Sequence, residues 1–99
     1  MTEDRSTLYA SWDRTRRHLT AARADISDQP DVDLSIADDF IKHNELGLAF
    51  DCLVEIGDEV NVRVTFWRAL DEAAREMGLY EDPQSGSARL CRERLAAAE

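Results

Sequence analysis

The stretch VNVRVTFWRALDEAAREMG, residues 60–78, decides whether this chain is all-helical or contains a β-strand. Apolar and polar residues alternate over 60–66, which is the pattern of a half-buried strand. From Val64 onward the apolar residues recur three or four apart, and residues 68–76 are rich in strong helix formers. A lone strand would also lack a partner. We therefore predict an extended entry or first turn over 60–64, then a helix that ends at Met77 before Gly78.

The segment before this stretch shows the same helical spacing. Over residues 8–26 apolar side chains recur four and three apart, and Ser6 or Thr2 can cap the start of this helix. The segment SDQP, residues 27–30, ends it because proline lacks an amide hydrogen and disfavours helical geometry in the preceding residue. The predicted buried stripe contains Leu8, Trp12, Thr15, Leu19, Ala22 and Ile26.

The central segment predicts two further helices. Residues 33–43 are expected to form a short amphipathic helix. Asn44 has the character of an N-cap for the next helix, which runs to about Ile56 with Gly57 as its terminator. This third helix is so apolar that only a narrow acidic stripe marks its solvent side, which predicts a central position in the bundle.

The end of the chain completes the predicted fold. Residues 80–86 contain proline, serine and glycine and indicate a loop, after which Ser87 can cap a last helix through about Ala97. No internal repeat or linker separates two cores. The sequence therefore predicts an all-α fold, with residues 1–99 forming one compact domain, a bundle of four or five helices.

Charge is distributed unevenly along the chain, whose net value is -9. Residues 1–24 hold five Arg against three acids, residues 25–59 hold eleven acids against the single Lys42, and residues 60–99 hold six Arg against seven acids. Such a negative surface repels nucleic acid phosphates and anionic membranes, whose binders need clustered Lys and Arg. We therefore expect a basic protein partner, and neither nucleic acid nor membrane.

The first residues, MTEDRS, lack the basic start and apolar stretch of a secretory signal, and no apolar run approaches the roughly 20 residues that span a bilayer. Cys52 and Cys91 belong to no CxxC motif or Cys/His cluster, so we expect two reduced thiols. These features predict a cytoplasmic protein.

The sequence contains none of the common catalytic motifs, such as GxSxG, HExxH or a phosphate-binding glycine loop, so we predict no enzyme activity and no cofactor. His43 has Asp39 four residues earlier on the same helix, and the two can form a local ion pair or share a metal ion. A zinc site needs three or four protein ligands, and only Glu45 lies nearby. We expect the ion pair.

Acidic residues gather in the middle third of the chain, where a charge run is most often a solvated face. Asp51 and Glu55, however, stand four apart on the most apolar helix with no Lys or Arg beside them in the sequence. Such like-charged neighbours weaken an isolated helix by roughly 0.2–0.5 kcal/mol per pair, and a cationic partner would relieve that repulsion. The predicted partner-binding residues are Asp38, Asp39, His43, Asn44, Glu45, Asp51, Glu55, Asp58 and Glu59.

The segment DFIKHNELGLAFDCL, residues 39–53, resembles the Maf-type immunity proteins of bacterial polymorphic toxin systems. The shared pattern is a helix, then His-Asn-Glu at 43–45, then a helix start with Gly-Leu-Ala at 47–49. The segment REMGL at 75–79 is also similar, so the likeness spans roughly residues 36–79. The resemblance implies an inhibitor that protects the producing cell and its siblings by binding one cognate toxin domain, often a nuclease.

The leading hypothesis is therefore an immunity protein that neutralises a cognate basic toxin through its acidic surface. A nuclease active site is basic because it holds phosphate, so an acidic protein can be steered to it. Two other functions stay open. One is a non-catalytic structural or regulatory interaction module, such as a helical homodimer with a merely solvated acidic face. The other is an enzyme or metal-binding protein that uses Asp39, His43 and Glu45.

Overall fold

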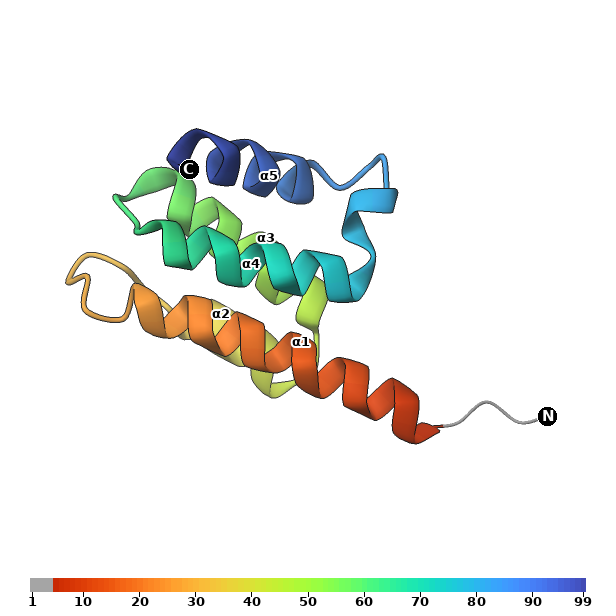
Figure 1. The fold of residues 1–99 in the computed structure, drawn as a ribbon. Coiled ribbons are helices and arrows are strands. Elements are labelled where there is room, and N and C mark those ends of the chain that lie inside the picture. The colour runs from red at the N-terminus through yellow and green to blue at the C-terminus, as the bar shows by residue number, and fades with distance from the viewer. Residues whose placement is uncertain (1–4) are drawn as a thin grey trace.

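A computed structural model describes residues 5–99 of this chain (Figure 1). Over these residues no β-strand is present, so the prediction of an all-α bundle of four or five helices is confirmed. The helices are α1 (Arg5–Asp25), α2 (Ser35–Lys42), α3 (Leu46–Glu59), α4 (Val64–Met77), the short 3-10 helix η1 (Leu79–Glu81) and α5 (Gly86–Ala98).

The segment that decides the fold behaves as expected. Val60 and Arg63 have extended backbone angles, with ψ of 164° and 158°, and α4 begins at Val64. It ends at Met77. The next residue, Gly78, has a φ of 69°, and its backbone N–H donates a hydrogen bond to a carbonyl of the last turn of α4. Glycine is favoured there because a Cβ atom makes this left-handed conformation costly.

Helices α1 and α4 run antiparallel and form the most extensive helix pair of the bundle (Figure 1). At one end the Arg63 guanidinium contacts the Asp25 carboxylate at 2.9 Å. At the other end Glu76 accepts hydrogen bonds from Ser11 at 2.8 Å and from Arg14. These contacts place the last turn of α4 opposite the second and third turns of α1. The first residues of α1 therefore extend beyond the end of α4 (Figure 1).

The core lies between α1, α3, α4 and α5, and its fully buried large side chains are Phe50, Phe66, Leu19, Ile26, Leu53 and Leu70. The predicted burial of Trp67 is confirmed, since this residue is only 4% exposed. Cys91 of α5 also points inward, as predicted, and its thiol contacts the Trp67 carbonyl at 3.8 Å. Within residues 5–99 the longest apolar helical stretch falls short of what crossing a bilayer requires.

The predicted burial of Trp12 and Leu8 is wrong. The rest of their stripe, including Leu19 and Ala22, is buried, but Trp12 is 38% and Leu8 is 42% exposed. Their helical spacing is correct, yet α4 ends opposite Ser11, so no described helix of the bundle covers the first turns of α1. The periodicity therefore identified the buried face of α1, but not the point along α1 at which α4 stops covering that face.

Two predicted boundaries of α3 are also wrong. Glu45, not Asn44, occupies the N-cap position, and Asn44 has a positive φ of 60° in the turn after α2. Gly57 does not end α3, which continues to Glu59 with Gly57 buried inside it. The reason is packing, since Gly57 lies against the ring of Phe66, where a side chain would collide.

The predicted caps at the two ends of the chain need correction as well. Ser85, not Ser87, is the N-cap of α5, and its hydroxyl accepts a hydrogen bond from the Ala88 backbone N–H at 3.2 Å. Ser6 already belongs to α1 and is not its N-cap. The other proposed cap, Thr2, lies outside the described residues.

Candidate interaction surface

Two of the predicted partner-binding carboxylates are occupied by the chain's own arginines. Both oxygens of Asp38 accept hydrogen bonds from Arg23, at 2.9 and 3.0 Å, which joins α2 to α1. Asp58 accepts two hydrogen bonds from Arg94 of α5, at 2.6 and 3.0 Å. Asp58 and Glu59 extend the acidic row that Asp51 and Glu55 begin on α3, and no Lys or Arg stands beside these four residues in the sequence. The row is nevertheless balanced at Asp58, because Arg94 reaches it from a helix 36 residues later in the chain.

Four other predicted carboxylates remain free. Asp51, Glu55 and Glu59 of α3 and Glu45 before it are exposed, and no ion pair or side-chain hydrogen bond to another residue of 5–99 engages them. The acidic row of α3 therefore divides into an internally paired end at Asp58 and an unpaired part that faces solvent. Repulsion between Asp51 and Glu55, one turn apart, is not relieved within this part of the chain.

Helices α3 and α5 pack together and run in the same direction. Asp51 lines a hollow together with Ser87 at the start of α5, and Asp58 meets Arg94 near its end. The opposite side of α3 carries Phe50, Leu53 and other core residues. Burial of that apolar side fixes the rotation of α3, and this rotation turns the carboxylates outward.

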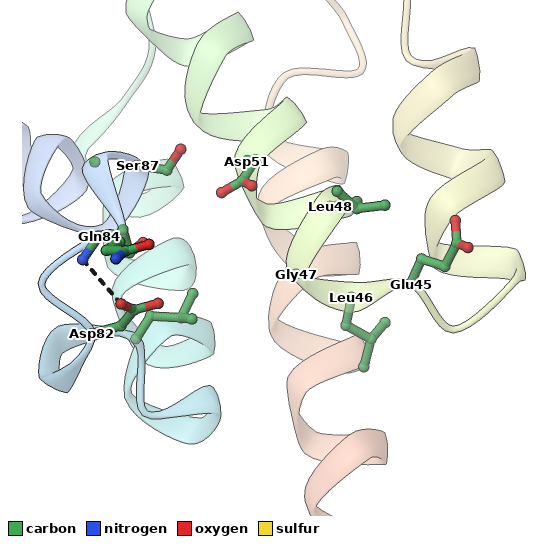
Figure 2. Close-up of a pocket in the computed structure, with 11 residues that line it drawn as sticks. Glu45, Leu46, Gly47, Leu48, Asp51, Asp82, Gln84 and Ser87 are labelled. Atoms are coloured by element: carbon green, nitrogen blue, oxygen red, sulfur yellow. Dashed lines mark hydrogen bonds between the residues drawn. The ribbon is translucent and has the colours of Figure 1, made fainter.

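An open groove of about 800 Å³ lies between the start of α3 and the segment from Leu79 to Ser87. Figure 2 shows Asp51 pointing toward the side of the groove that carries Gln84 and Ser87, whereas Glu45 and Leu48 point toward the α2 side. Asp82 stands on the opposite wall, where its carboxylate accepts the Gln84 backbone N–H at 2.9 Å. No Lys, Arg or His lines the groove.

The chemistry of this groove suits a cationic group. Its walls offer carboxylates from α3 and from the loop after η1, and Gly47 and Gly86 leave open space at its edges. Leu48, which is 49% exposed, adds an apolar contact beside the carboxylates. An Arg or Lys side chain of another protein would find charge-assisted hydrogen-bond acceptors there. We call Glu45, Leu48, Asp51, Glu55 and Asp82 the acidic face.

His43 and Asp39 form the local contact that their spacing predicts. The Nδ1 atom of His43 lies 3.6 Å from the Asp39 carboxylate and 2.8 Å from the Asp39 backbone oxygen. Both side chains are exposed. Glu45 does not join them in a ligand set, since residues 5–99 contain no group of three His, Cys, Asp or Glu side chains able to hold a metal ion. Asn44 instead accepts a hydrogen bond from Arg16 at 2.6 Å.

Sequence reasoning missed the second wall of the groove. Asp82, Gln84 and Ser87 lie more than 30 residues from Asp51, and nothing in their local pattern indicates that the loop after η1 faces α3. Helical spacing likewise did not show that Leu48 is 49% exposed at this groove. No family model, curated protein or solved structure significantly matches this chain.

Proposed function

We propose that this chain is an immunity protein that binds a cognate bacterial toxin domain and neutralises it through the acidic face. One observation carries the proposal: Asp51 and Glu55 stay unpaired and exposed, although Asp38 and Asp58 each hold an arginine of the same chain. Arginines are therefore available in this fold, but they do not reach the middle of α3. An external cation would complete the row.

The arrangement around Leu48 supports a protein partner over a small cation. Specific protein interfaces combine an apolar centre with a polar or charged rim, and Leu48 lies between Glu45 and Asp51 in this way. The groove is open, so a side chain of a partner can enter without any rearrangement of the helices. The residues that resemble the Maf-type immunity family, 43–45 and 47–49, lie in the α2–α3 turn and at the groove edge.

Neutralisation in this proposal requires no chemistry. A toxin that cleaves nucleic acid carries a basic substrate site, and an acidic protein is attracted to it through the long-range field. Docking of the acidic face over that site, or beside it, excludes the substrate. Electrostatic steering can raise the association rate constant from about 10⁵–10⁶ M⁻¹s⁻¹ toward 10⁸ M⁻¹s⁻¹ at low salt.

Co-expression tests the proposal directly. The chain is co-expressed with the C-terminal domain of the large open reading frame next to its gene, and both cell growth and co-purification are measured. Rescue of growth together with a stable complex is the expected result. A toxin domain that stays fully active and unbound in the presence of the chain would contradict the proposal.

A charge-reversal pair then tests the acidic face. Asp51→Lys with Glu55→Lys should slow association with the toxin domain by on the order of tenfold or more and reduce its salt dependence. Glu72→Lys with Glu93→Lys changes the net charge equally at exposed positions outside the acidic face, and it should have a much smaller effect. Equal slowing by both pairs would show that net charge, and not this face, governs binding.

A further inference from the structure

A second exposed surface lies on the first turns of α1, beyond the end of α4. Leu8, Tyr9 and Trp12 form it and are 42%, 55% and 38% exposed. The rings of Tyr9 and Trp12 meet edge to face, with centroids 5.5 Å apart. We call these three residues the aromatic patch. Tyr and Trp are enriched where proteins bind one another, because they provide large rigid contact areas.

The aromatic patch adjoins the acidic face. Arg16, one turn after Trp12, donates a hydrogen bond to the Asn44 side chain at 2.6 Å, and Asn44 directly precedes Glu45. An open hollow of about 390 Å³ is lined by Tyr9, Trp12, Asp13, Arg16 and Asn44. The large apolar side chains exposed in residues 7–99 are Leu8, Tyr9, Trp12, Ile36 and Leu48, so four of the five lie on these two adjoining surfaces.

The two surfaces differ in their charged groups, because Arg16 borders the aromatic patch and the acidic face carries free carboxylates. Arg16 contacts no carboxylate within 4 Å among the described residues, whereas nearby Asp13 is already paired with Arg17 at 2.7 Å. The acidic face offers the unpaired carboxylates of Glu45, Asp51 and Glu55. A pair of adjoining surfaces with opposite charge is complementary to itself under a two-fold rotation, because each surface of one copy meets the other surface of its partner.

We propose that a second copy of this chain docks on this region and forms a two-fold symmetric dimer. Each aromatic patch covers Leu48 of the partner copy, and each Arg16 faces the partner's carboxylates. Pairing acidic face with acidic face is disfavoured, since it would oppose unpaired carboxylates. This inference does not rest on a toxin partner. If both proposals hold, a cationic partner and the second copy compete for the acidic face.

The dimer should be weak, because each copy carries a net charge of -9 and the two copies repel one another at long range. We expect a dissociation constant on the order of 10–100 μM in 0.15 M salt, which corresponds to about 6 kcal/mol of binding free energy. Sedimentation equilibrium of the full chain over a concentration series measures it. A chain that remains monomeric up to about 1 mM would overturn the proposal.

Charge exchange between two variants tests the geometry. Arg16→Glu and Glu45→Arg should each weaken dimerisation about tenfold or more, and an equimolar mixture of the two should restore it, since opposite charges then meet in the mixed dimer. Arg68→Glu is the matched control, because it introduces the same charge change at an exposed position of α4 whose ion-pair partner is Glu99, away from both surfaces. Equal weakening by Arg16→Glu and Arg68→Glu, or a mixture that fails to restore association, would overturn the proposed contact.

Trp12→Ala supplies an uncharged variant for the same measurement. It should weaken dimerisation at least as much as Arg16→Glu, because it removes the largest side chain of the aromatic patch. Circular dichroism melts of all variants establish that they are folded. Undiminished dimerisation of a folded Trp12→Ala variant would show that any dimer forms through another surface and would likewise overturn the proposal.

Discussion

Gly57 in α3 packs against the aromatic ring of Phe66 in α4 so closely that the space for a side chain is already filled. A Cβ atom at this position would stand 2.9 Å from Cζ of Phe66, nearer still to its Cε2 atom, and 3.1 Å from Cη2 of Trp67. Both rings are buried in the core, so neither can move aside without disturbing its neighbours. The close approach of α3 and α4 therefore depends on the missing side chain.

Replacement of Gly57 by alanine should destabilise the protein despite the better helix propensity of alanine. Overpacking costs roughly 1–3 kcal/mol, which exceeds the gain of up to about 1 kcal/mol from replacing a helical glycine. Gly47→Ala in the same helix is the control, since nothing lies within 4 Å of a Cβ atom there, and it should leave the stability unchanged or raise it. Chemical denaturation measures both, and a Gly57→Ala variant as stable as Gly47→Ala would refute the packing argument.

The two tryptophans should respond differently to truncation. Trp67 is 4% exposed and packs edge to face on Phe66, so Trp67→Ala should lower the free energy of unfolding by roughly 3–5 kcal/mol. Trp12→Ala should cost less than about 1 kcal/mol in the monomer, because its ring remains 38% exposed. Thermal and urea melts at low protein concentration compare them, and equal losses would contradict the observed burial.

Acid should release the contact between α1 and α4 at Glu76. Hydrogen bonds from Arg14 and Ser11 lower the pKa of the Glu76 carboxyl from 4.5 to about 2. Because the folded state holds the carboxylate more strongly, its stabilising contribution is present above pH 4.5 and is lost as the pH falls toward 2. In urea melts between pH 2 and 6, the stability advantage of the natural chain over Glu76→Gln should therefore shrink toward the acid end. A constant difference across this range would contradict the assignment.

Alkali should act on the polar contact between η1 and α4. The Tyr80 hydroxyl donates a hydrogen bond to the Asp71 carboxylate at 2.5 Å, and burial together with this bond raises the pKa of Tyr80 above its ordinary value of 10.0. The unfolded phenol ionises first, so stability should fall as the pH rises above about 10. Tyr80→Phe should lose roughly 1–2 kcal/mol at neutral pH and show a smaller alkaline loss.

The loss of stability in alkali that remains in the Tyr80→Phe variant should come from the neighbouring thiol of Cys91. Burial raises the pKa of Cys91 from 9.0 to about 11. The unfolded thiol therefore ionises first, and the stability of the folded state falls as the pH rises above 9. Denaturation of both proteins between pH 7 and 11 separates the two groups. If Tyr80→Phe loses stability in alkali as steeply as the natural chain, Tyr80 does not contribute to the effect.

The sequence alone determined the helices, because helix signals are local. Apolar residues three and four apart predicted α1 and α4, and Gly78 marked the end of α4 through its left-handed conformation. Adjacent side chains and backbone hydrogen bonds a few residues apart create these patterns, so no knowledge of distant contacts is needed. The buried position of Trp67 followed from the same spacing.

Tertiary structure alone decided which residues of each pattern meet another helix. A glycine such as Gly57 is typical of a helix end, yet Gly57 lies inside α3 because it packs against Phe66 of α4. Asp58 and Asp51 lie on one acidic row, but only Asp58 finds an arginine, and it comes from α5. Asp82 joins Asp51 at the groove only because α5 returns alongside α3. These outcomes depend on helix lengths and on contacts between residues far apart in the chain, and local spacing carries no information about such contacts.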